Sequence, residues 1–156
     1  MRNPYFALAC RGSTVKSAYI VVRDGGVWQI RDLPTQTNYM DVIATARSET
    51  AIVVGINTYP ATNGGATISN GSLTTFYRSV DEGQTWAAAA TFGRLGTTID
   101  NEGVHVRSMR HSGTTFYALA NYNFISPGGS PYYRKHGVIL LTSTDNGITW
   151  TIYTDG

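Results

Sequence analysis

The sequence predicts an all-β fold built from a repeated unit of antiparallel strands. Three observations lead to this prediction. An eight-residue motif occurs twice, short apolar runs alternate with turn-forming residues, and no stretch has the length or periodicity of a stable helix. The composition agrees, because glycine (17 residues) and tyrosine (10 residues) are frequent while charged residues make up only 14%. These proportions are typical of a β protein with many turns and a neutral polar surface.

The repeated motif is Ser-x-Asp-x-Gly-x-Thr-Trp. Its first copy, which we call the first octapeptide, spans residues 79–86, and the second octapeptide spans residues 143–150. Each copy follows an apolar run and ends at tryptophan, so each is predicted to form the turn of a β-hairpin. The aspartate can accept hydrogen bonds within its own turn, glycine permits positive φ, threonine adds a hydroxyl, and tryptophan packs beneath the turn. We therefore expect a structural role for Ser79, Asp81, Gly83, Thr85, Trp86, Ser143, Asp145, Gly147, Thr149 and Trp150.

The spacing of 64 residues relates other parts of the chain as well. At this offset Asn57 corresponds to Asn121, and Gly64-Gly65 corresponds to Gly128-Gly129. A shorter, degenerate copy of the motif near the N-terminus keeps its aspartate, glycine and tryptophan as Asp24, Gly26 and Trp28. A fixed register over this distance indicates internal duplication, which is typical of β-propellers and similar arrays.

Apolar runs bounded by turn signals place the strands of each unit. The first unit is expected to have strands at about 5–10, 18–23 and 27–31. The second is expected at about 40–46, 50–56, 73–79 and 85–91, since the alanine run 87–90 is too short for an independent helix. The third is expected at about 103–109, 114–121, 138–143 and 149–154. The chain is thus predicted to be one domain with blades at about 1–33 (incomplete), 34–93 and 94–156.

The motif resembles the Asp-box, or BNR, repeat of sialidases and many other β-propeller proteins. The resemblance covers most of the chain, but only through residues of the scaffold. It implies four-stranded antiparallel blades in a ring of about six, whereas this chain supplies about three blades. The chain would then be a fragment of a longer propeller, complete a ring with copies of itself, or pack on another chain of a larger assembly. By association, a chain that starts at Met1 without a signal and has a neutral polar β surface suits a virion component.

The same resemblance raises the question of catalysis. The sialidase family implies a cluster of arginines, a tyrosine–glutamate nucleophile pair, an aspartate acid/base and usually an Arg-Ile-Pro segment, which this chain lacks. The nearest candidates for catalytic residues are Arg107, Arg110, Asp100 and Glu102. Glycoside hydrolysis needs two carboxylates held at a defined separation across one pocket. Because Asp100 and Glu102 suit a loop equally well, we expect a non-catalytic module for binding or assembly. The alternative is part of a sialidase-like glycoside hydrolase.

The long connections at about 57–72 and 122–137 are expected at the end of the sheets opposite the octapeptides. Polar loops with aromatic residues on a rigid scaffold are where binding residues concentrate. The candidates for ligand binding are Tyr122, Asn123, Tyr132, Tyr133, Arg134 and His136, with Tyr59 as the counterpart in the second unit. Aromatic planes beside polar donors suit sugar rings, so a glycan or a cell surface is one expected partner. A packed Ω-loop or a protein–protein contact explains the same residues.

Charge and cysteine content exclude several classes of function. A net charge of +2 gives little attraction to nucleic acid. No stretch is long enough for a membrane-spanning helix, and the apolar run before Cys10 is too short for a signal peptide. The single cysteine cannot form an internal disulfide, and three histidines show no spacing of metal ligands. We therefore expect no metal or other cofactor. The sequence does not define the localisation, for which a virion and an extracellular surface are candidates.

Overall fold

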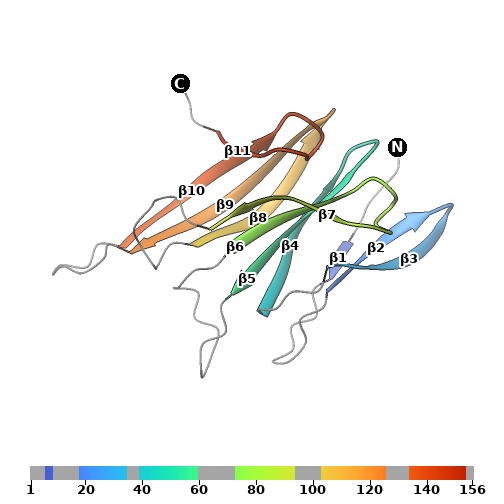
Figure 1. The fold of residues 1–156 in the computed structure, drawn as a ribbon, viewed down its shortest axis with the longest axis horizontal. Coiled ribbons are helices and arrows are strands. Elements are labelled where there is room, and N and C mark those ends of the chain that lie inside the picture. Colours follow the sequence, from blue (N-terminus) through green and yellow to red (C-terminus); the bar gives the residue numbers. More distant parts are fainter. Residues whose placement is uncertain are drawn as a thin grey trace.

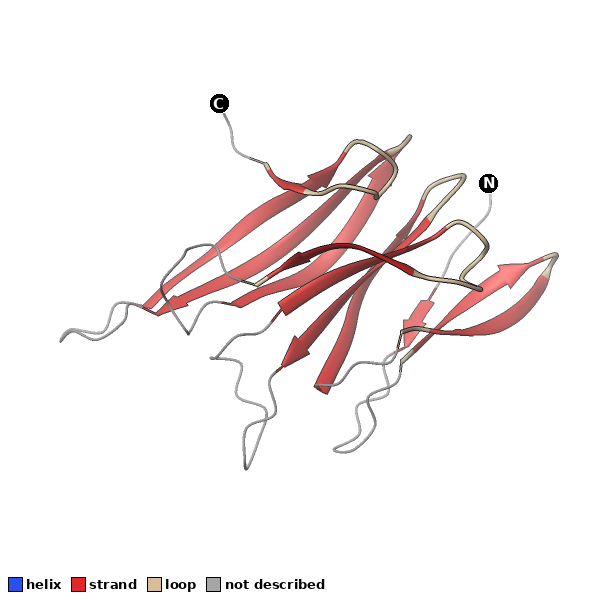
Figure 2. Cartoon of the chain, viewed as in Figure 1, coloured by secondary structure: helices blue, strands red, loops and turns tan. Residues whose placement is uncertain are grey.

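A computed structural model describes residues 6–8, 18–34, 39–59, 73–93, 103–125 and 134–153. In these ranges every regular element is a β-strand (Figure 2). The strands are β1 (Phe6–Leu8), β2 (Tyr19–Asp24), β3 (Val27–Asp32), β4 (Tyr39–Arg47), β5 (Ile52–Tyr59), β6 (Leu73–Ser79), β7 (Ala87–Phe92), β8 (Gly103–Ser112), β9 (Thr115–Ile125), β10 (Arg134–Ser143) and β11 (Thr151–Ile152). Within the same ranges there is no helix with the length and apolarity needed to span a bilayer.

The strands form three antiparallel sheets, each made of consecutive strands. Unit one is the sheet β1-β2-β3, unit two is β4-β5-β6-β7 and unit three is β8-β9-β10-β11. The all-β class and the division into a three-stranded and two four-stranded sheets are therefore confirmed. The alanine run in β7 is a strand, as expected, and pairs with β6. In Figure 1 the tight turns of all three sheets lie at the same end.

The duplication is visible in the backbone of β4 and β8. The register of β4 on β5 shifts between Val42 and Ala44, and the register of β8 on β9 shifts between Val106 and Ser108. These two bulges lie at equivalent positions, 64 residues apart. A bulge bends its strand and increases the local twist. The first strand of units two and three is therefore shaped by the same irregularity.

Several strands differ in length from the sequence prediction. Strand β9 continues to Ile125 and β10 begins at Arg134, so a large part of the expected loop 122–137 is a paired ladder. The prediction of a loop was wrong here, because aromatic residues fit a pleated strand and pairing satisfies their backbone groups. Strand β5 likewise continues to Tyr59. Strand β11 contains only Thr151 and Ile152, shorter than the expected 149–154, because Thr149 belongs to the preceding turn.

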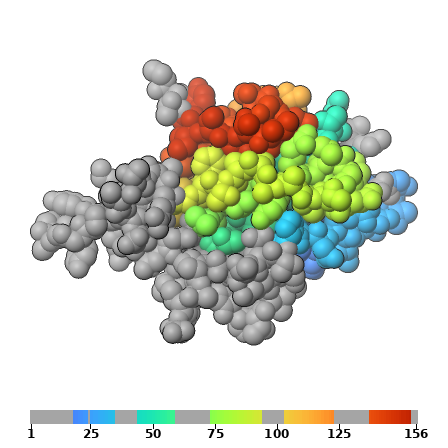
Figure 3. Space-filling model, in the orientation of Figure 1, coloured from blue at the N-terminus to red at the C-terminus, as the bar shows by residue number. Residues whose placement is uncertain are grey.

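Unit two is packed between the other two units (Figures 1 and 3). Alternate residues of β5 point to opposite faces of its sheet. Ile52, Val54 and Ile56 pack with Ile20 and Val22 of unit one. Val53 faces unit three and belongs to a second core whose other members include Phe76, Val104, Val106, Met109, Phe116, Ala118, Ala120, Leu141 and Trp150. Because both faces of β5 are covered, its residues 52–56 form a continuous apolar run instead of an alternating one.

Candidate functional site

The first octapeptide forms a turn that is closed by its own side chains. The hydroxyl of Ser79 donates to Oδ1 of Asp81 (2.7 Å) and accepts a hydrogen bond from the amide of Gly83 (2.8 Å). The amide of Thr85 donates to Asp81 Oδ1 (2.9 Å), and its hydroxyl donates to Asp81 Oδ2 (2.6 Å). Both carboxylate oxygens of Asp81 are therefore engaged within the turn.

The second octapeptide repeats this network. Ser143 donates to Asp145 Oδ1 (2.8 Å) and accepts from the amide of Gly147 (2.9 Å). Thr149 donates its amide to Asp145 Oδ1 (2.8 Å) and its hydroxyl to Oδ2 (2.5 Å). The amide of Ile148 also donates to Asp145 Oδ1 (3.1 Å). The turn predicted from the residue types is confirmed in both copies.

These hydrogen bonds hold both aspartates in their charged form. The hydroxyl and amide of Thr85, followed by the hydroxyl of Ser79, lower the pKa of Asp81 from 3.8 to about 2. For Asp145, burial favours the neutral form, but hydrogen bonds from Thr149 and Ser143 outweigh it and lower the pKa to about 2. A carboxyl group with this pKa carries no proton near neutral pH, so neither aspartate can serve there as a general acid.

The tryptophan that ends each octapeptide packs toward the preceding sheet. The indole of Trp150 donates to the carbonyl of Gly147 (3.3 Å), which places the ring beneath its own turn, as expected. The same ring stacks on Phe76 of unit two, with centroids 4.0 Å apart and planes 8° from parallel. Trp86 packs against the core between units one and two. Both rings therefore connect neighbouring sheets, a role that the sequence did not reveal.

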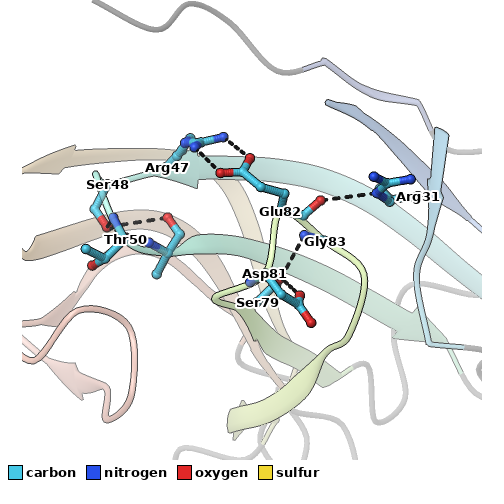
Figure 4. Close-up of polar contacts among 9 residues, drawn as sticks. Arg31, Arg47, Ser48, Thr50, Ser79, Asp81, Glu82 and Gly83 are labelled. Carbon is cyan, nitrogen blue, oxygen red and sulfur yellow. Dashed lines mark hydrogen bonds and ion pairs between the residues drawn. The ribbon is translucent and has the colours of Figure 1, made fainter. Parts of the chain in front are cut away.

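The residue after each aspartate is a second connection that the sequence analysis missed. Glu82 and Asn146 occupy equivalent positions and have φ of 58° and 62°. The carboxylate of Glu82 pairs with Arg47, while its carbonyl accepts a hydrogen bond from Nε of Arg31 in unit one (3.3 Å), as Figure 4 shows. No sequence signal pointed to this position, because the two residues differ in type.

Asn146 makes the equivalent connection between units two and three. Its carbonyl accepts from Nε of Arg78 (2.8 Å), its Oδ1 accepts from the hydroxyl of Ser48 (2.6 Å), and its Nδ2 donates to Thr50 (2.6 Å). Its own amide donates to the carbonyl of Thr114 (3.0 Å). Each octapeptide thus fastens its sheet to the sheet before it.

The degenerate copy in unit one forms a different and shorter turn. Gly25 and Gly26 have φ of 54° and 90°, as a two-residue type I′ hairpin requires. Asp24 pairs directly with Val27 across this turn. Trp28 is 50% exposed, and the guanidinium of Arg23 lies 6.0 Å from its ring centroid. Unlike its counterparts, Trp28 is not covered by another of the three described sheets.

The ligand-binding candidates lie mainly at the end of the β9–β10 ladder. Asn123 pairs with His136, Tyr122 pairs with Gly137, and Arg134 is the first residue of β10. The half-buried ring of Tyr122 occupies the space over Gly137, where a β-carbon would lie 2.2 Å from its Cε1. Tyr122 is therefore packed, but as part of strand β9 and not in the expected Ω-loop. Tyr59 ends β5, and Tyr132 and Tyr133 lie outside the described residues.

The catalytic candidates are not assembled into a site within the described ranges. Arg107 and Arg110 are exposed residues of β8, and Arg107 lies at the bulge. Arg110 donates from Nη1 to the carbonyl of Met109 (2.7 Å). Asp100 and Glu102 lie outside the described residues. Over the part that the structure describes, no three His, Cys, Asp or Glu residues are grouped as metal ligands.

The fold and these turns define the protein as a repeated all-β array in which aspartyl turns join successive sheets. Comparison of the chain with models of known protein families and with curated protein sequences gives no significant match.

Proposed function

We propose that this chain is a non-catalytic β-propeller module that acts in binding or assembly. The observation that carries the proposal is the complete use of the two repeated aspartates in holding turns. Support for a propeller comes from successive antiparallel sheets that pack face to face with their tight turns at one end. Propeller blades follow one another in this manner.

The electrostatics of the octapeptides favour a structural role over catalysis. Hydrolysis of a glycoside needs one carboxyl group that holds a proton and a second that does not, on either side of one bond. Asp81 and Asp145 lie in separate turns, and both have a pKa of about 2. At neutral pH both are therefore anions, and each accepts hydrogen bonds from amides and hydroxyls of its own turn.

We further propose that the end opposite the octapeptides recognises a glycan or a cell surface, on a virion or a similar assembly. Support comes from Asn123 and His136, which are paired neighbours near the end of the β9–β10 ladder. Tyr132 and Tyr133 immediately precede β10. Aromatic rings would stack on the apolar face of a sugar, and the amide and imidazole would bond its hydroxyls.

A glycan array together with fluorogenic sialosides and other glycosides tests this function. The expected result is binding without hydrolysis, with binding weakened by Tyr132→Ala or Tyr133→Ala. Arg107→Ala is the matched control on β8 and should leave binding unchanged. Hydrolysis that is lost in Arg107→Ala would overturn the proposal in favour of a sialidase-like glycoside hydrolase. The absence of both binding and hydrolysis would leave assembly as the role of the module.

A further inference from the structure

Units two and three are joined by buried side chains that bond to the backbone of β8. Oδ1 of Asn57 accepts a hydrogen bond from the amide of Val106 (3.2 Å), and Nδ2 of Asn57 donates to the carbonyl of Val106 (3.3 Å). Thr74 donates to the carbonyl of Val104 (2.7 Å). Asn57 and Thr74 are fully buried. This face of unit two therefore has both apolar groups and fixed polar groups that hold the first strand of the next sheet.

Unit three presents the same face to solvent. The face of unit two consists of Val53, Gly55, Asn57, Thr74, Phe76 and Arg78, paired as Val53–Arg78, Gly55–Phe76 and Asn57–Thr74. Its counterparts 64 residues later are Tyr117, Leu119, Asn121, Val138, Leu140 and Thr142, paired in the same way. We call this second set the outgoing face. Its residues Tyr117, Leu119 and Val138 are 39%, 47% and 63% exposed, whereas Val53 and Thr74 are completely buried.

Unit one presents the complementary side of a junction. In units two and three the tryptophan after the turn packs toward the preceding sheet, and Trp150 lies on Phe76. In unit one, Trp28 and Ile30 pair with Arg23 and Val21, so they lie on the face opposite the buried Ile20 and Val22. We call Val21, Arg23, Trp28 and Ile30 the incoming face. Trp28 and Ile30 are 50% and 66% exposed.

We propose that a second copy of this chain docks head to tail, with its incoming face on the outgoing face of the first copy. A second copy is the partner that the junctions within the chain indicate, because the outgoing face of unit three repeats the face of unit two that unit three covers. Both halves of the contact belong to this one chain. Trp28 of the second copy would lie on Leu140, the counterpart of Phe76. The proposal rests on the proposed role in assembly and specifies its partner.

The docking mode has a consequence for assembly size. A head-to-tail contact joins two different surfaces, so an open assembly of any length keeps one free incoming face at one end and one free outgoing face at the other until a ring closes. Leu119 and Trp28 belong to different faces, and each can be changed without altering the other. A mixture of two single-face variants can therefore form one intact contact and no more.

The test is sedimentation velocity of the full chain over a range of concentrations. The expected result is reversible association that is about tenfold or more weaker in Trp28→Ser and in Leu119→Ser. An equimolar mixture of the two variants should form a dimer and nothing larger. Ile148→Ser is the matched control, because Ile148 is 52% exposed on the second octapeptide and belongs to neither face. Circular dichroism of each variant establishes that it is folded.

The outcomes distinguish this proposal from the proposed function. Head-to-tail docking is overturned if the chain stays monomeric up to its solubility limit. It is also overturned if the Trp28→Ser variant self-associates as strongly as the unchanged chain. Failure of the mixed variants to form a dimer also overturns it. A monomer that still binds glycans leaves the binding role intact. An associating chain that hydrolyses glycosides refutes the non-catalytic function and leaves the docking contact standing.

Discussion

A β-carbon on Gly147 would lie 2.5 Å from Cγ2 of Val53, which places the tip of the second octapeptide directly against β5 of the preceding sheet. Gly147 also has a φ of 85°, which an L side chain rarely adopts. At the equivalent Gly83, the nearest atom is Cγ of Arg31 at 3.2 Å, on a flexible side chain. Glycine is thus required at Gly147 by both conformation and contact.

Gly147→Ala is expected to lower the free energy of unfolding by about 3 kcal/mol. About 1–2 kcal/mol comes from the left-handed backbone, and the rest comes from overpacking against Val53. Gly26→Ala is the control, because its φ is 90° but nothing lies within 4 Å of the added carbon. Urea denaturation should show a loss of only about 1–2 kcal/mol for this variant. Equal losses in the two variants would argue against the contact.

Replacement of the three tryptophans by alanine should give a graded series. Trp150 is 7% exposed and stacked on Phe76, so Trp150→Ala should cost about 3–5 kcal/mol. Trp86 is half-buried, so Trp86→Ala should cost less. Trp28→Ala should have the smallest effect, because half of the residue is already exposed. The measurement is denaturation at low protein concentration, and a largest effect at Trp28 would contradict the packing.

Asn57→Ala is expected to destabilise the chain by about 1–3 kcal/mol, because it leaves buried backbone groups of Val106 with weaker partners. Asn121→Ala is the matched control at the equivalent position, where the side chain is half-buried on the outgoing face. In dilute solution this control should change the stability by less than about 0.5 kcal/mol. Similar losses in both variants would indicate that Asn57 does not hold β8.

The stability should fall in acid because of the two aspartyl turns. Their pKa is depressed in the folded chain, so the stabilisation is complete above the unfolded value of 3.8 and disappears as the pH falls toward 2. Asp145→Asn removes one titrating group and should flatten the dependence between about pH 4 and 2. The measurement is the unfolding free energy against pH, and an unchanged slope in this variant would contradict the assignment.

Much of the architecture could be predicted from local pattern. The octapeptides gave the turns, because serine, aspartate, glycine and threonine bond within eight residues of one another. The ends of β9 and β10 could not be located, since Tyr122 and Asn123 fit a loop and a strand equally well. The hydrogen bonds of Asn146 could not be predicted either, because its partners Arg78 and Ser48 are 68 and 98 residues away in the sequence. Such contacts depend on how whole sheets pack.

The placement of unit two between two cores has a consequence for the order in which the molecule opens. Of the described sheets, it alone has a hydrophobic partner on each side. In a linear array of this kind, fraying begins at the terminal members and the interior member opens last. The amide hydrogens of Val53, Val54 and Ile56 should therefore exchange with deuterated solvent only when the whole array comes apart.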